Sequence, residues 1–169
     1  MSLTIRQLRL PDEGGLLDDI IYLACTWSEP TPERQHPDRD ALLNGKMSVY
    51  REDWGRPGDE CLIAEVDGKF VGGAFYRVFS HERPSQAFID VETPELGIAT
   101  VDTHRGTGVG RAVITALLTL ARLDGYQQIS LAVSDGNFSK QLYDSVGFEE
   151  FERLEGGWKM LRRLGAQRR

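Results

Sequence analysis

A glycine-rich turn joins a predicted strand to a long predicted helix in the second half of the chain. The strand spans 96–101, the turn spans 105–110, and the helix runs from 109 to about 124. A helix N-terminus offers free backbone N–H groups and the positive end of the helix dipole, which together favour anions. Glycine lets a phosphate touch the backbone where a Cβ would hold it away. The pattern therefore predicts a phosphate-binding turn within an α/β fold.

The spacing of the glycines excludes two common phosphate loops. A P-loop needs Gly-Lys followed by Ser or Thr, and this turn has neither residue in place. A dinucleotide-binding fingerprint needs G-x-G-x-x-G near the start of a βαβ unit, with an acidic residue about 20 positions later. Here the glycines run G-x-G-x-G in the second half of the chain. The pattern that fits is R-x-x-G-x-G after an apolar strand, with Arg105, Gly108 and Gly110.

A second motif lies downstream of the turn. A buried strand is predicted at 128–133 and a short helix at 138–146, which ends in Leu142-Tyr143-x-x-x-Gly147-Phe148. Gly147 is suited to the helix C-cap. With both motifs in this order, the chain resembles the GNAT superfamily of acyl-CoA-dependent N-acetyltransferases, closely over 95–148 and loosely elsewhere. It departs from that family at one position. The family usually has Asn seven residues before this tyrosine, where the chain has Gly136, and Asn137 follows.

The resemblance implies a single α/β domain over 1–169 with a mixed, mainly antiparallel sheet flanked by helices, in the order β-αα-βββ-α-β-α-ββ. The residue patterns agree with that order. They predict strands at 3–10, 61–66, 69–79 and 96–101, with Asp67-Gly68 as a hairpin turn, and helices at about 11–24 and 40–50. A terminal hairpin is predicted over 148–164.

The resemblance also implies an activity, the transfer of an acetyl group from acetyl-CoA to a primary amine of a small molecule or peptide. The alternative is a non-catalytic acyl-CoA-binding module. One backbone N–H within 98–101 would stabilise the oxyanion. The residues expected to bind acetyl-CoA are Ala99, Val101, Arg105, Gly106, Thr107, Gly108, Val109, Gly110, Asn137 and Tyr143.

Tyr143 and Glu95 are the candidate catalytic residues. An ordinary phenol titrates near pH ~10, close to an alkyl thiol, so Tyr143 could protonate the departing thiolate. The alternative is a packing tyrosine. Glu95 is the candidate base, where several GNAT enzymes carry a glutamate, although an ordinary carboxylate needs burial or a bridging water to act on an ammonium. Glu92 and Asp90 could take this role, and Glu95 could instead be an exposed strand-end carboxylate.

Charge and composition exclude several classes of protein. The net charge of −6 argues against a nucleic-acid partner, and we interpret the basic end (Arg162, Arg163, Arg168 and Arg169) as solvated. No apolar run reaches about 18 residues and no signal peptide is evident, which predicts a cytoplasmic protein without a membrane span. Cys25 and Cys61 are expected to be reduced core residues. The histidines are scattered, so no metal site is expected.

The acceptor is expected to bind between the variable segments of the chain. From 28 to 60 there are eight carboxylates against five Lys or Arg residues. With Trp27 and Trp54 nearby, this excess suggests an acidic mouth for a cationic amine. The alternative is an ordinary solvated surface. The terminal hairpin supplies an edge strand through which a homodimer could form.

Overall fold

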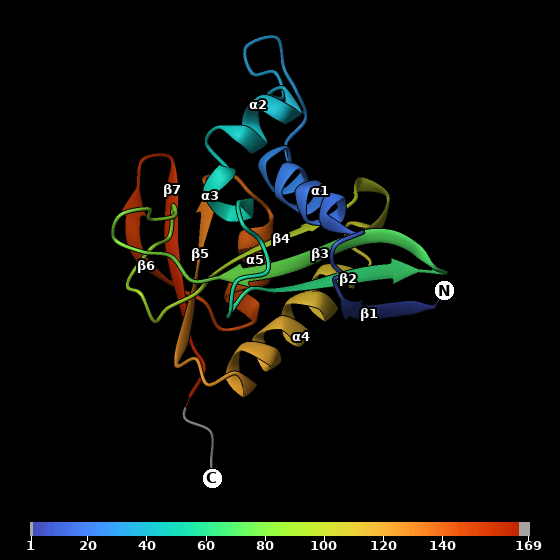
Figure 1. The fold of residues 1–169 in the computed structure, drawn as a ribbon. Helices are drawn as coiled ribbons and strands as arrows, with labels where there is room; N and C mark the ends of the chain where they lie inside the picture. The colour runs from blue at the N-terminus through green and yellow to red at the C-terminus, as the bar shows by residue number, and fades with distance from the viewer. Residues whose placement is uncertain (1, 166–169) are drawn as a thin grey trace.

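The computed structural model describes residues 2–165, so the outermost ends of the predicted domain, with Arg168 and Arg169, lie outside it. A seven-stranded sheet runs through the molecule in the order β1-β2-β3-β4-β5-β7-β6 (Figure 1). β4 and β5 run parallel, and the other neighbours are antiparallel. The predicted mixed, mainly antiparallel sheet is confirmed. Its strands are β1 (Leu3–Gln7), β2 (Glu60–Val66), β3 (Lys69–Arg77), β4 (Glu95–Thr100), β5 (Gln128–Ser134), β6 (Glu149–Leu154) and β7 (Gly157–Arg163).

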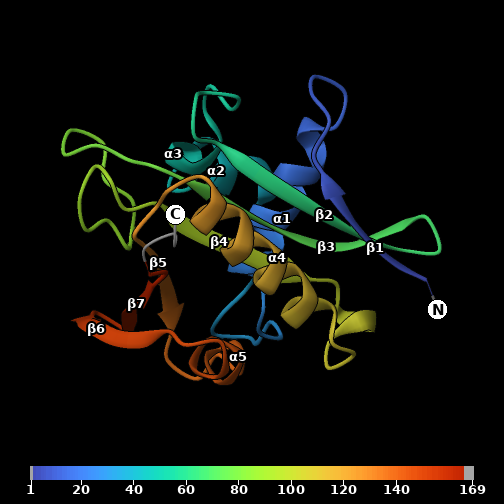
Figure 2. The same ribbon diagram turned by 90° about the horizontal axis from the view of Figure 1, so that it is seen from below.

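Helices cover both faces of the sheet. α1 (Gly14–Cys25), α2 (Arg39–Asn44) and α3 (Ser48–Arg51) lie on one face, and α4 (Val109–Leu123) lies on the other (Figures 1 and 2). α5 (Ser139–Ser145) lies beside β5 and β7. The helix predicted at 40–50 is two helices, because the first ends at Gly45. Glycine is a poor helix former, and a Cβ at Gly45 would lie 2.7 Å from the Ala41 carbonyl oxygen.

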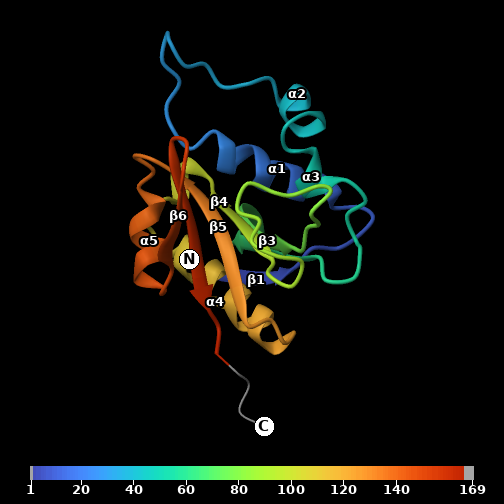
Figure 3. The same ribbon diagram turned by 90° about the vertical axis from the view of Figure 1, so that its left-hand side faces the viewer.

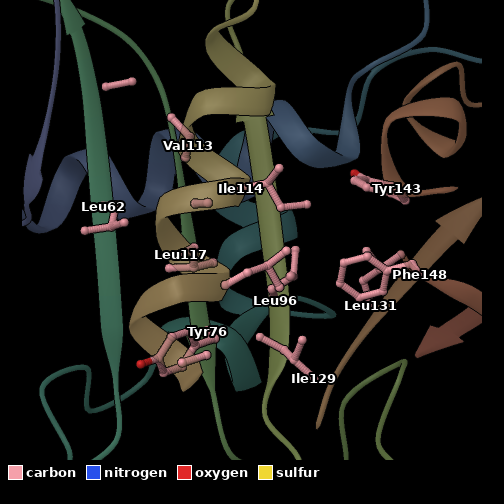
Figure 4. Close-up of a cluster of buried hydrophobic side chains, with 14 of the residues drawn as sticks. Leu62, Tyr76, Leu96, Val113, Ile114, Leu117, Ile129, Leu131, Tyr143 and Phe148 are labelled. Carbon is pink, nitrogen blue, oxygen red and sulfur yellow. The ribbon is translucent and has the colours of Figure 1, made fainter. Parts of the chain in front are cut away.

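The sheet separates two hydrophobic clusters. The first packs α4 and α5 against the sheet and includes Val113, Leu117 and Leu131 (Figure 4). The second packs α1, α2 and α3 against the opposite face and includes Ile20 and Phe75. Full burial of a large aliphatic side chain contributes about 2 kcal/mol. The apolar stripe of α4 therefore anchors that helix, and with it the glycine-rich turn, against the sheet.

The two cysteines differ in environment. Cys61 is buried in β2, as predicted. The prediction that Cys25 is also a core residue is wrong, because this last residue of α1 is exposed. Within residues 2–165, no helix has the length and apolar character that crossing a membrane requires. The same residues contain no group of three or more His, Cys, Asp or Glu side chains placed to hold a metal ion.

Candidate functional site

A cleft of about 590 Å³ opens where β4 and β5 separate. The two strands pair at Glu95 and Ser130 and diverge beyond that point. Figure 3 shows them side by side at the centre of the molecule. The walls of the cleft come from α1, β4, the glycine-rich turn, β5 and α5. Its lining residues include Leu23, Ala24, Trp27, Gly97, Ile98, Ala99, Thr100, His104, Arg105, Gly106, Gly108, Gly110, Ala132, Asn137 and Tyr143.

The glycine-rich turn forms one end of this cleft, as predicted. Gly106 and Gly108 have φ of 71° and 92°, a left-handed backbone that favours glycine. A methyl group at either position would meet no atom within 4 Å, so the space above the turn is open. α4 begins directly afterwards, at Val109, whose side chain is buried in the core. Val109 can therefore offer a ligand only its backbone, and the first amides of α4 remain directed toward the open space.

Arg105 connects the turn to two other walls of the cleft. Its Nη1 donates to the Trp27 carbonyl oxygen at 3.1 Å, and its Nη2 pairs with Asp102 at 2.8 Å. The guanidinium lies over the Phe138 ring at 5.4 Å, and Phe138 packs edge-on against Trp27 with centroids 6.4 Å apart. Arg105 was predicted from the sequence as an acetyl-CoA-binding residue, but Phe138 was not, because nothing in the spacing shows that the start of α5 faces the end of α1.

The hydrogen-bond pattern of β4 decides which of its amides face the cleft. The Val101 amide donates to the Val71 carbonyl at 2.9 Å, so it is directed toward the β3 side. Backbone groups alternate along an antiparallel pair, and the register continues from Thr100 opposite Gly72. Ala99 therefore also bonds toward β3, whereas Ile98 and Thr100 direct their N–H groups toward β5. Among residues 98–101, where one amide is expected to stabilise the oxyanion, strand register therefore leaves the amides of Ile98 and Thr100 directed toward the cleft.

Tyr143 lies on α5 with its ring against Phe148, at a centroid separation of 6.2 Å. It is 7% exposed and lines the cleft. In Figure 4 its hydroxyl points from α5 toward β4. Burial raises the pKa of Tyr143 to about 12. The phenol is therefore neutral at physiological pH and can donate a proton, although it is a weaker acid than an exposed tyrosine.

Asn137 lines the same cleft at the start of α5. Its side-chain oxygen accepts a hydrogen bond from the Ser139 amide at 2.9 Å. This bond satisfies one of the amides that a helix N-terminus leaves unpaired. Asn137 therefore orients the beginning of α5, the helix that carries Tyr143.

Glu95 opens β4 but does not line the cleft. It is 4% exposed. One carboxylate oxygen accepts from the Tyr50 hydroxyl at 2.9 Å, and the other accepts from the Ala87 amide at 3.0 Å. Burial raises the pKa of Glu95 above its ordinary value. The open alternative of an exposed strand-end carboxylate is wrong for Glu95, whereas Glu92 is exposed.

The carboxylates of segment 28–60 do not form the mouth of the cleft. None of them is among its described lining residues. Asp59 pairs with Arg77 inside the protein, and Glu52 pairs with Arg83 at the surface. Trp54 packs against Phe75 and Arg77, away from Trp27. The acidic mouth is therefore wrong for this cleft, because ion pairs that sequence spacing does not reveal occupy two of these carboxylates.

Solved structures of other proteins share this fold. Over 96% of the chain, the structure resembles PaiA N-acetyltransferase from Thermoplasma acidophilum, solved with coenzyme A (TM-score 0.70, 14% identity, 99% of that chain). YncA from Salmonella typhimurium, solved with acetyl-CoA, matches over the whole chain (TM-score 0.69, 21% identity, 98% of that protein). Ribosomal-protein-alanine N-acetyltransferase from Brucella melitensis is 27% identical over 94% of this chain and 95% of its own (TM-score 0.62).

Comparison of the sequence shows the family of the chain. Mycothiol acetyltransferase from Thermobispora bispora is 31% identical over 116 residues, which are 67% of this chain. The match spans only 38% of the length of that relative. The model of the Acetyltransferase (GNAT) family matches residues 21–148, a range that contains the glycine-rich turn, Glu95 and Tyr143. The chain therefore belongs to the GNAT family of acetyltransferases.

Proposed function

We propose that this protein transfers the acetyl group of acetyl-CoA to a primary amine of a small molecule or peptide. The observation that carries the proposal is one cleft lined by both the glycine-rich turn at the start of α4 and Tyr143 on α5. Two proteins with the same fold were solved with coenzyme A or acetyl-CoA. Acetyl-CoA needs one site for its pyrophosphate and one for its acyl group. The glycine-rich turn would bind the first, and the space beside Tyr143 would bind the second.

The pyrophosphate of the donor would bind at the amides of 106–110, where the helix dipole and the Arg105 guanidinium favour negative charge. Asn137 would act indirectly, through the start of α5. The amides of Ile98 and Thr100 face the space between the strands and are the candidates for holding the pantetheine arm and the oxyanion. Ala99 lines the wall of the cleft, whereas the Val101 amide is bonded to the Val71 carbonyl.

The reaction needs an amine with a free electron pair. The amine nitrogen attacks the thioester carbonyl carbon, the oxyanion collapses, and the C–S bond breaks. Tyr143 then gives its proton to the departing thiolate, the nitrogen loses its extra proton to water, and water returns a proton to the tyrosinate. The pKa of about 12 places this tyrosine ~2 units above an ordinary phenol, which costs about 3 kcal/mol if the thiolate stays solvated. Burial of the thiolate in the same cleft would raise its own pKa and reduce that mismatch.

An acetyl-CoA turnover assay on pooled primary amines tests the proposal, with free thiol as the readout. Wild-type protein should release coenzyme A only when an amine is present. Tyr143→Phe keeps the ring and removes the hydroxyl, so turnover should fall about 10²-fold with little change in acetyl-CoA affinity. Tyr126→Phe is the matched control, because Tyr126 packs against Tyr76, not in the cleft.

Three outcomes separate the alternatives. Turnover that depends on Tyr143 supports the enzyme. Calorimetric binding of acetyl-CoA without turnover on any amine supports the non-catalytic acyl-CoA-binding module. A dissociation constant of 1 mM corresponds to a binding free energy of only about 4 kcal/mol. If the protein does not bind acetyl-CoA even at millimolar concentration, both the enzyme and the acyl-CoA-binding module are ruled out.

A further inference from the structure

Ala87 is held by side chains at the point where β4 and β5 begin to separate. Its amide donates to Glu95 at 3.0 Å, and its carbonyl oxygen accepts from the Ser130 hydroxyl at 2.8 Å. Glu95 and Ser130 are also the pair that joins the two strands. All three residues are buried, and Ala87 and Ser130 are fully so. The pair at the apex of the cleft therefore binds both backbone groups of one residue from a distant segment.

The residues on either side of Ala87 are held in the same way. The Gln86 amide donates to the Tyr50 hydroxyl at 3.0 Å, and the same hydroxyl donates to Glu95 at 2.9 Å. The Phe88 carbonyl oxygen accepts from the Lys159 ammonium at 2.8 Å. We call residues 86–88 the clamped segment. Side chains from α3, β4, β5 and β7 hold it, and Figure 3 shows the yellow-green loop between β3 and β4 beside β4 and β5.

Residues 86–88 do not line the cleft, but Glu95 and Ser130 hold Ala87 directly behind its apex, and Phe88 packs against the hydrophobic cluster under α1, α2 and α3. Side chains alternate along a strand, so Gly97 and Ala99 share the face of Glu95, and Ala132 shares the face of Ser130. These three small residues line the cleft together with Leu23 and Ala24 of α1. The glycine-rich turn lies at the other end of β4. The clamped segment therefore lies next to the apex of the cleft, and the acyl end of a donor whose pyrophosphate binds at the turn would extend toward this apex.

We propose that Glu95, Ser130 and Tyr50 are positioning residues that hold the clamped segment behind the apex of the cleft and so set the shape of the acceptor site. The proposal rests on the proposed function and deepens it. A general base must reach the proton within about 3 Å, directly or through one water. Both Glu95 oxygens are engaged inside the protein, and Glu95 does not line the cleft. Glu95 then acts through Ala87, and the amine loses its proton to water in the cleft.

Ser130→Ala is the discriminating variant, because the Ser130 hydroxyl donates to the Ala87 carbonyl oxygen and does not bond to the Glu95 carboxylate. If Ser130 positions the clamped segment, KM for the amine should rise about fivefold or more in this variant, because one buried hydrogen bond is lost. The dissociation constant for acetyl-CoA should stay within about twofold, and the pH–rate profile should keep its shape. Glu95→Gln and Tyr50→Phe should behave alike. Tyr50→Phe keeps the ring packed against Phe75 and Phe79, so it serves if Ser130→Ala does not fold.

Gln128→Ala is the matched control. Gln128 also joins β5 to the loop before β4, through a 2.9 Å bond to Thr93, but its side chain does not bond to the clamped segment and does not line the cleft. It should leave KM for the amine unchanged. Hydrogen exchange at 86–88 gives a readout that needs no turnover, and these amides should exchange faster in Ser130→Ala than in Gln128→Ala.

Other results would overturn the clamp. If Glu95 is the base, Glu95→Gln removes an ionisation from the pH–rate profile while Ser130→Ala keeps the wild-type KM. If the contacts only stabilise the fold, Ser130→Ala and Gln128→Ala lower Tm with no change in KM. Exchange that stays slow at 86–88 in Ser130→Ala would also refute it. Absence of any amine turnover, with exchange changed as expected, would instead count against the proposed function.

Discussion

Gly110→Ala should stabilise the protein and weaken its binding of acetyl-CoA. Gly110 is the second residue of α4, and its φ lies outside the left-handed region. An added methyl would lie 3.4 Å from Leu142 Cδ2 and 3.6 Å from Thr100 Oγ1, which are ordinary contacts. The free protein therefore accommodates alanine, and the helix gains about 0.5–1 kcal/mol because alanine loses less backbone entropy than glycine. For a domain of this size, Tm should rise by roughly 1–4 °C.

The same methyl group occupies the cleft, since Gly110 lines it together with Thr100 and Leu142. Overpacking by one methyl costs about 1–3 kcal/mol, and 1.4 kcal/mol corresponds to about a tenfold loss of affinity. Calorimetric titration with acetyl-CoA measures the affinity, and thermal unfolding without ligand measures the stability. The two effects have opposite signs, so general damage to the fold cannot produce both.

Gly15→Ala is the matched control for this experiment. Gly15 is the second residue of α1, a Cβ there would meet nothing within 4 Å, and it does not line the cleft. It should raise Tm by a similar amount and leave the affinity unchanged. If Gly110→Ala binds acetyl-CoA as tightly as wild type, the donor does not lie against the start of α4, and the assignment of the turn is refuted.

Three further perturbations probe the fold and its assembly. Burial raises the pKa of Tyr143 to about 12, above the unfolded value near 10, so its stabilising contribution is complete below pH ~10 and is lost as pH rises toward 12. Over this range the free energy of unfolding, measured with urea, should fall by about 2–3 kcal/mol less in Tyr143→Phe than in wild type. An equal fall in both proteins would contradict this prediction. Asp59→Ala leaves the Arg77 guanidinium, about 1% exposed, without its partner carboxylate. The free energy of unfolding, measured with urea, should fall by about 3–5 kcal/mol. A fall of less than about 1 kcal/mol would show that the ion pair is dispensable. β6 is an edge strand, and Phe151 in it is 51% exposed, so two β6 edges could pair to form a homodimer. Sedimentation velocity at tens of micromolar should show a dimer that Phe151→Glu dissociates. A monomer of the wild-type protein at this concentration would rule out the dimer.

Local sequence patterns predicted most of the secondary structure because each pattern reports a local cause. The apolar stripe of α4, the Asp67-Gly68 hairpin and Gly147 at the end of α5 depend on neighbours a few residues away. The prediction of one helix over 40–50 was wrong at Gly45, where α2 ends. The apolar spacing continues past this glycine, so the spacing alone does not show the break in the helix. Cys25 failed for a related reason. Leu23, Ala24 and Trp27 near it are apolar, but its place at the end of α1 exposes it.

The sequence by itself determined the order of elements, the glycine-rich turn at the start of α4 and the tyrosine on α5. These follow from backbone preferences and periodicities that operate within one or two elements. Only the tertiary structure decided which amides of β4 face the cleft, because strand register sets that alternation. It also decided that Glu95 is enclosed by Tyr50 and Ala87, and that Asp59 pairs with Arg77. Burial and pairing depend on residues far apart in the chain, which no local pattern brings together.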